Sequence, residues 1–153
     1  MTKDVLRELP DVLQFMRLLW ELEHALQKRS KRMAASVGVT GLQRLVLRIV
    51  GLFPEIAAGE LATILHVHPS TLTGVLDRLI DQGLILRGTH QSDRRRAVLA
   101  LTSNGRRVNR TKKGTVEAAV RTALRNVSAQ DRAVARRVLA TICQSLEANA
   151  GFE

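Results

Sequence analysis

Apolar residues recur at helical spacing along most of the chain, and two short apolar stretches are typical of strands. The first helical stripe follows Pro10 and Asp11, a pair suited to the first turn of a helix, and predicts a helix over about residues 10–35. Gly38 and Thr40 end this helix. Its apolar positions are Val12, Phe15, Met16, Leu19, Leu22 and Leu26.

Three shorter helices are predicted between Thr40 and Gly83. The first opens with a capping box at Thr40 to Gln43, and the second covers about residues 58–65. The third begins at Pro69, with His68 at its N-cap, and ends at Gly83. The residues expected to face inward are Leu42, Leu45, Val46, Ile49 and Val50 in the first, Leu61, Ile64 and Leu65 in the second, and Leu72, Val75, Leu76, Leu79 and Ile80 in the third.

Residues 84–86 and 97–101 are predicted strands, which form a hairpin of residues 84–101 with an arginine-rich tip. Helical periodicity returns at Thr102, and Ser128 with Asp131 marks the start of a last helix. That helix is expected to turn Val134, Val138, Ile142 and Leu146 inward, and to bury Cys143 as a structural thiol.

This order of elements, two short helices joined by a turn and followed by a hairpin, is that of a winged helix-turn-helix. The fold class expected is therefore mainly α with a small β-hairpin wing. We expect a single domain over residues 1–153, with the winged lobe at about 40–102. The helices at about 10–35 and 103–150 carry apolar stripes that need a partner, either their own domain or a second copy of the chain.

The distribution of charge adds a functional signal to the predicted fold, because the positive charge is concentrated in one segment. The chain holds 24 Lys and Arg against 14 Asp and Glu, a net charge of +10. The segment from Arg87 to Lys113 holds nine of these bases and a single acid, whereas the chain before it and the chain after it are each near neutral. Clustered bases favour a polyanion-binding surface over the alternative of a solvated basic loop.

The outward face of the helix at 69–82 adds a second DNA-binding signal. Short hydroxyl side chains and a glycine allow close approach to a major groove, whereas an ordinary surface helix is usually rich in Lys and Glu. The candidate DNA-binding residues of this helix are Pro69, Ser70, Thr71, Thr73, Gly74 and Arg78.

Two runs of sequence resemble the MarR family of bacterial transcriptional regulators. Residues 92–105, SDRRRAVLALTSNG, are similar to the family's wing signature, and residues 72–84, LTGVLDRLIDQGL, are similar to its recognition helix. The resemblance covers essentially the whole chain. It implies a homodimer joined through the terminal helices and bound to double-stranded DNA at a palindromic site.

By this resemblance Arg95 enters the minor groove and Asp93 holds it, while Arg94 and Arg96 reach phosphates or stabilise the wing. Arg96 stands where the family often has a small residue, so which of the three arginines reads the groove stays open. Asp93 has the alternative role of a turn-forming residue before the strand.

The resemblance also implies an effector, a small aromatic or phenolic anion bound between the dimerisation helices and the DNA-binding lobe. The residues expected to form its pocket are Phe15, Trp20, His24, Arg44 and Arg48. The alternative for Phe15 and Trp20 is a place in the core or the dimer interface.

A metal site, a cofactor and a catalytic site find little support in the sequence. His66 and His68 do not share a helical face, so no metal site is expected, and no cofactor is implied. The chain has no glycine-rich phosphate loop, nucleophile elbow or carboxylate pair with a histidine base, which indicates a protein that is not an enzyme. No secretory signal or membrane-spanning stretch is expected, so a cytoplasmic protein that does not bind membranes is favoured.

The sequence therefore predicts a sequence-specific, ligand-responsive repressor. Two alternatives remain. One is a non-specific nucleoid-associated or RNA-binding protein, and the other is a winged helix used for protein or membrane contact. A much higher affinity for one palindrome than for competitor DNA would distinguish the sequence-specific repressor from both alternatives.

Overall fold

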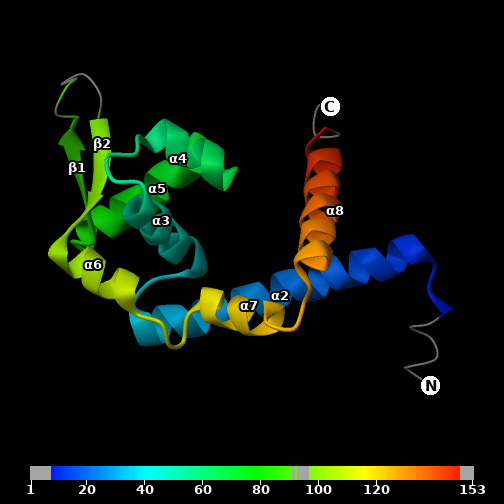
Figure 1. Cartoon of the computed structure of the whole chain (residues 1–153). Helices are drawn as coiled ribbons and strands as arrows, with labels where there is room; N and C mark the ends of the chain where they lie inside the picture. The colour runs from blue at the N-terminus through cyan, green and yellow to red at the C-terminus, as the bar shows by residue number, and fades with distance from the viewer. Residues whose placement is uncertain (1–7, 91, 93–96, 149–153) are drawn as a thin grey trace. The chain divides into compact units, whose positions relative to one another are not determined.

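The computed structural model describes residues 8–90, 92 and 97–148. Its elements are α2 (Asp11–Val37), α3 (Gly41–Leu52), α4 (Ala58–Leu65), α5 (Pro69–Asp81), β1 (Ile85–Thr89), β2 (Ala97–Leu101), α6 (Ser103–Arg110), α7 (Val116–Leu124) and α8 (Ala129–Ala148) (Figure 1). The chain forms two compact units, Met1–Val116 and Glu117–Glu153. Helices α4 and α5 followed by the antiparallel hairpin β1–β2 confirm the winged helix-turn-helix.

One apolar core holds α3, α4, α5 and the hairpin together. Each fully buried aliphatic side chain contributes about 1.5–3 kcal/mol to its stability. Two expected core residues, Leu45 and Ile64, are instead 48% and 54% exposed. Their neighbours Leu47 and Ala62 take the buried positions. The buried cluster consists of Val39, Val46, Leu47, Ile49, Val50, Ile56, Leu61, Ala62, Leu72, Leu76, Leu79, Leu84, Ile85, Leu99 and Val108.

The helix boundaries around α3 follow from local sequence signals, as predicted. The Thr40 side chain accepts a bond from the Gln43 backbone N–H at 3.3 Å, and the Gln43 side chain accepts one from the Thr40 N–H at 2.8 Å. Gly38, at φ +85°, adopts the left-handed conformation that ends α2. The Gly41 N–H donates to Ser30 Oγ at 2.7 Å, which ties α2 to the start of α3.

The hairpin is longer on its first strand than the sequence predicts, because β1 extends to Thr89. Its register pairs Ile85 with Leu101 and Thr89 with Ala97. The Leu99 N–H donates to the Ile56 carbonyl at 2.9 Å, so the connection between α3 and α4 is joined to β2. The wing is therefore held to the helical core by backbone as well as by apolar contacts.

A threonine and a glycine join the hairpin to α6. Thr102 Oγ1 donates to the Gly83 carbonyl at 2.6 Å and accepts from the Gly105 N–H at 2.9 Å, so it caps α6 while holding the start of β1. A Cβ added at Gly105 would lie 1.9 Å from the Leu84 carbonyl oxygen. Only glycine fits at this contact without displacing backbone.

Beyond Thr102 the helical pattern divides into three helices rather than two. The break between α6 and α7 contains Gly114 at φ +76°, a conformation that favours glycine. The predicted cap of the last helix is confirmed, because Ser128 Oγ accepts from the Asp131 N–H at 3.0 Å.

The second unit contains no buried residue among those described. Val134 and Val138, expected to face inward, are exposed in the single chain, as are Leu146 and Cys143. Of the predicted stripe only Ile142 is half-buried, so the inward stripe and the buried thiol are wrong for one copy of α8.

No single described helix is long and apolar enough to cross a membrane. Only α2 and α3 taken together, a pair bent by 69°, reach that composition. Four apolar residues of α3, Val46, Leu47, Ile49 and Val50, are buried in the core of the first unit, which accounts for its apolar character.

Candidate nucleic-acid interface

Helix α5 is fixed at both ends by local bonds. At its start His68 Nδ1 accepts from the Ser70 N–H at 3.2 Å, and Pro69 occupies the first turn, both as predicted. At its end Gly83 is left-handed at φ +65°, and the Leu84 N–H donates to the Leu79 carbonyl at 2.9 Å. These caps set the length and direction of the helix.

The face of α5 opposite its buried leucines is open to solvent. The predicted DNA-binding residues on this helix are all exposed: Pro69, Ser70, Thr71, Thr73, Gly74 and Arg78. The Thr73 hydroxyl donates to the Pro69 carbonyl at 2.9 Å, so toward a ligand its oxygen can act only as an acceptor. A Cβ added at Gly74 would meet nothing within 4 Å, so the fold itself does not require glycine there.

The predicted wing residues Asp93, Arg94, Arg95 and Arg96 lie outside the described residues. The strands on either side of them are described: β1 ends at Thr89 and β2 begins at Ala97. Next to the tip, His90 Nε2 lies 3.5 Å from Glu55 Oε2 in the connection between α3 and α4. The base of the wing tip therefore lies close to the connection between α3 and α4.

Arg87 is a residue of this region that the sequence singled out only as part of the basic cluster. Its guanidinium lies 3.2 Å from Asp77 Oδ1 and so links β1 to α5. Both side chains are more than half exposed, so the pair contributes at most about 1 kcal/mol. The pairing depends on where β1 lies beside α5, which no local sequence signal encodes.

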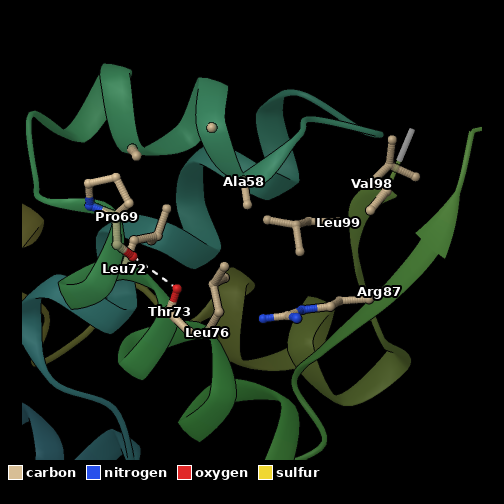
Figure 2. A pocket seen from close by; sticks show the side chains of 11 residues that line it. Ala58, Pro69, Leu72, Thr73, Leu76, Arg87, Val98 and Leu99 are labelled. Atoms are coloured by element: carbon tan, nitrogen blue, oxygen red, sulfur yellow. Dashed lines mark hydrogen bonds between the residues drawn. The ribbon is translucent and has the colours of Figure 1, made fainter. Parts of the chain in front are cut away.

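A pocket of about 260 Å³ lies between α4, the first turns of α5 and the hairpin (Figure 2). Figure 2 shows the Arg87 side chain extending across it toward Leu76 and Thr73. A guanidinium beside apolar walls suits an amphipathic anion. The lining residues are Ala58, Gly59, Ala62, Pro69, Leu72, Thr73, Leu76, Arg87, Ala97, Val98 and Leu99.

The five residues predicted to bind an effector are not gathered around a described cavity. Phe15, Trp20 and His24 are exposed on α2. Arg44 is 2% exposed, and both it and Arg48 bind the end of α6 rather than an open space. None of the five lines the pocket beside Arg87 or a second cavity of about 370 Å³ between α3, β2 and α6.

Two histidines considered as metal ligands have structural positions in the turn between α4 and α5. His66 is the left-handed C-cap of α4 at φ 54°, and His68 caps α5. Within residues 8–90, 92 and 97–148, no group of three or more His, Cys, Asp or Glu side chains could hold a metal ion.

Part of the basic cluster stabilises α6. Arg106 donates to the Leu101 carbonyl at 2.8 Å, and Arg107 donates to Asn104 Oδ1 at 2.6 Å. Arg107 and Arg110 lie in the last turn of α6, where positive charge favours the helix dipole. The basic residues of the segment from Arg87 to Lys113 are therefore divided between the wing and α6.

The comparisons with known proteins agree with this geometry. The model of the MarR family matches residues 39–97, which include α3, α4, α5 and β1. A comparison with curated protein sequences finds none that matches.

Solved structures cover nearly the whole chain. CouR from Rhodococcus jostii RHA1, bound to p-coumaroyl-CoA, is 24% identical with a TM-score of 0.72, over 90% of this chain and 93% of its own. The S. aureus MepR–DNA complex is 17% identical with a TM-score of 0.71, over 86% and 97%. A probable transcriptional regulator from Pseudomonas aeruginosa is 28% identical with a TM-score of 0.58, over 82% and 96%.

The segment matched by the family model covers the winged helix-turn-helix from α3 to β1, including the exposed face of α5. The wing signature has a physical basis in this fold, because Thr102 and Gly105 join the hairpin to α6. Residues 39–97 match the MarR family, and the chain shares the winged helix-turn-helix fold of the solved structures of MarR and of a MepR-like protein.

Proposed function

We propose that the chain is a homodimeric repressor that recognises a palindromic operator in double-stranded DNA, with α5 in the major groove and the wing in the adjacent minor groove. The observation that carries this proposal is the exposed, small-residue face of α5 beside an arginine-rich hairpin. A recognition helix of this kind needs side chains short enough to let its backbone approach the base edges. This function requires no catalytic group and no cofactor.

Helix α5 supplies groups for two kinds of contact. Ser70 and Thr71 lie in its first turn, where hydroxyls and backbone N–H groups suit phosphate oxygens. Thr73 offers an acceptor oxygen and a methyl group, which suit base amino groups and the thymine methyl. Arg78, one turn further, adds a charge for the backbone or a guanine edge.

The wing supplies the minor-groove contact in this proposal. Arg95 is assigned to the groove and Asp93 to its support, with Arg94 and Arg96 at phosphates. An inserted arginine favours a narrow, A·T-rich minor groove through its shape and potential. The hydrogen bond from the Leu99 N–H to the Ile56 carbonyl, with His90 lying close to Glu55, would limit how far the hairpin can swing away from α5.

Dimerisation is proposed from the apolar surface that one chain leaves uncovered. Large exposed apolar residues concentrate on α2, α7 and α8, where contiguous patches are unfavourable in water. A second copy of the chain would cover them and would place two α5 helices on successive major grooves. These residues are Val12, Leu13, Phe15, Met16, Leu18, Trp20, Leu22, Leu26, Val120, Leu124, Val134, Val138, Leu139 and Leu146.

An effector, proposed as a small aromatic or phenolic anion, would relieve repression by changing the spacing of the two α5 helices. CouR, one of the similar structures, is bound to p-coumaroyl-CoA. Two places are candidates: the surface of Phe15, Trp20 and His24 on α2, and the pocket beside Arg87. Titrating salicylate into the protein tests both, because a Trp20 fluorescence change supports the first, and a shift in DNA affinity lost in Arg87→Met supports the second.

The proposed function is tested by selecting bound duplexes from a random pool at a fixed salt concentration and then measuring two matched variants. Thr73→Ala on α5 and Thr63→Ala on α4 both remove an exposed hydroxyl that donates to the carbonyl four residues earlier, at 2.9 Å and 3.0 Å. Thr73→Ala is expected to weaken the selected sequence by about 1–3 kcal/mol and to alter base preference within the half-site. Thr63→Ala is expected to change neither.

Two outcomes would contradict the proposal. The absence of any palindrome among the selected duplexes would favour a non-specific nucleoid-associated or RNA-binding protein. Equal effects of the two threonine variants would remove α5 from the recognition surface. The proposed cytoplasmic location follows from this function, because the operator lies in the bacterial cytoplasm.

A further inference from the structure

Arg44 is a buried cation that binds the end of another helix. Its guanidinium donates from Nη1 to the Val108 carbonyl, and from Nη2 to the carbonyls of Asn109 at 3.0 Å and Thr111 at 2.7 Å. The last carbonyls of an α-helix have no partner within the helix and form the negative end of its dipole. Arg44 on α3 therefore caps the C-terminal end of α6. The carbonyls that it binds lie 64 to 67 positions further along the sequence.

Helices α3 and α6 are joined by hydrogen bonds at two successive turns of α3 and approach each other closely at a third. One turn after Arg44, Arg48 Nη1 donates to Asn109 Oδ1 at 3.2 Å. Near the end of α3, a Cβ on Gly51 would lie 2.5 Å from Asn109 Nδ2, so the approach there is close. This arrangement leaves α6 little freedom to turn about its own axis.

The contacts of Arg44 with the carbonyls of Val108, Asn109 and Thr111 form a clamp on the end of α6. The clamp matters because of where this segment lies in the chain. At its start, α6 is fixed to the hairpin by Thr102 and Gly105. At its end, the carbonyl of Thr111 accepts a hydrogen bond from Arg44, and the chain then continues to Glu117, where the second compact unit begins. The covalent route from the wing to the C-terminal helices therefore runs through the segment that Arg44 holds.

We propose that Arg44 is a positioning residue for operator recognition: it fixes the direction in which the chain leaves the DNA-binding lobe, and thereby the spacing of the two α5 helices in the dimer. This inference rests on the proposed dimeric, palindrome-binding function. A planar guanidinium can serve three carbonyls at once, whereas a lysine ammonium in the same place would reach fewer of them.

The test is the tolerance of the full-length protein to half-site spacing. The selected palindrome is compared with versions that have one base pair inserted or removed at the centre, which shifts the half-sites by about 3.4 Å and rotates them by about 35°. The wild-type protein is expected to lose affinity by a factor on the order of ten or more for each altered spacing. Arg44→Met is expected to lose much less, and Arg44→Lys an intermediate amount.

A matched control separates the clamp from the loss of a positive charge. Arg107→Met removes an arginine whose side chain binds only Asn104 of its own helix in the described contacts, and its spacing preference is expected to equal that of the wild type. A second readout is trypsin cleavage after Lys112 or Lys113, both exposed beside the clamped carbonyls. Cleavage there is expected to be faster in both Arg44 variants than in the Arg107 variant.

The possible outcomes separate a failure of the positioning role of Arg44 from a failure of the proposed palindrome-binding function. Arg44 variants that keep the wild-type spacing preference and cleavage rate would overturn the positioning role. If Arg44→Met does not fold, the same two measurements on Arg44→Lys, which keeps the charge, decide the question. A wild-type protein that prefers no palindrome would overturn the proposed function itself.

Discussion

Among the described glycines, Gly105 is the one where an added side chain would meet the closest neighbouring atom. A Cβ there would lie 1.9 Å from the Leu84 carbonyl oxygen. This oxygen belongs to the backbone and also accepts a hydrogen bond from Thr102 Oγ1 at 3.3 Å. Relief of this overlap requires α6 to move away from the start of β1. We expect Gly105→Ala to lower the free energy of unfolding by about 3 kcal/mol, measured by urea denaturation.

Gly59 provides the control for this substitution. It lies in helix α4, is exposed, and a Cβ added there would meet nothing within 4 Å. Gly59→Ala is expected to raise stability by about 0.4–1 kcal/mol, because alanine lowers the entropy of the unfolded chain. If Gly105→Ala were as harmless as Gly59→Ala, the close contact of α6 with the hairpin would be wrong.

Gly74 gives a residue-level separation of function from stability. No neighbouring atom requires glycine at this position, although glycine costs a helix interior about 1 kcal/mol relative to alanine. We expect Gly74→Ala to stabilise the protein while weakening operator binding, because the added methyl group would separate α5 from the groove. Thermal unfolding and a binding isotherm on the same preparation measure both effects, and a variant that binds as well as the wild type would contradict this role.

Among the elements, the wing is the one whose charge should matter most for DNA. Arg95→Ala is expected to weaken binding and to relax the preference for A·T-rich sequence beside each half-site, because the minor-groove contact would be lost. Affinity for operators with A·T-rich and G·C-rich flanks measures this effect. Arg107→Ala on α6 serves as the comparison, and a loss of flank preference in it alone would place the minor-groove contact on α6 instead of the wing.

Elements defined by local signals could be predicted from the sequence. The capping box at Thr40, the left-handed Gly38 and the proline at the start of α5 involve residues within a few positions of one another. The exposed face of α5 followed from the same periodicity, because its opposite face carries the leucines of the core.

Features that depend on distant parts of the chain could not be predicted in this way. Arg44 was expected at a ligand pocket, yet its burial depends on carbonyls of α6 that the fold brings against α3. The pairing of Arg87 with Asp77 likewise depends on the position of β1 beside α5. The exposure of α8 could not be judged from its apolar stripe, since periodicity indicates a buried face without saying which molecule buries it.

At the scale of the whole molecule, the uncovered apolar faces of α2, α7 and α8 predict an obligate dimer. We expect the purified protein to sediment as a dimer at micromolar concentration. Val138→Asp on α8 is expected to shift it toward monomer, because a carboxylate would be buried in an apolar interface. Thr63→Asp, on exposed α4, controls for the added charge. A wild-type protein that sediments as a monomer would contradict the dimer.

The central claim is that two copies of α5 and its wing read one palindromic DNA sequence. The most direct test is the ratio of affinities for the selected palindrome and for a scrambled duplex of equal length, measured across a range of salt concentrations. The proposal predicts a ratio of about 10³ or more near physiological salt, while both affinities fall steeply as salt rises. A ratio near one, with the same salt dependence for both duplexes, would show that the basic surface binds DNA without reading it.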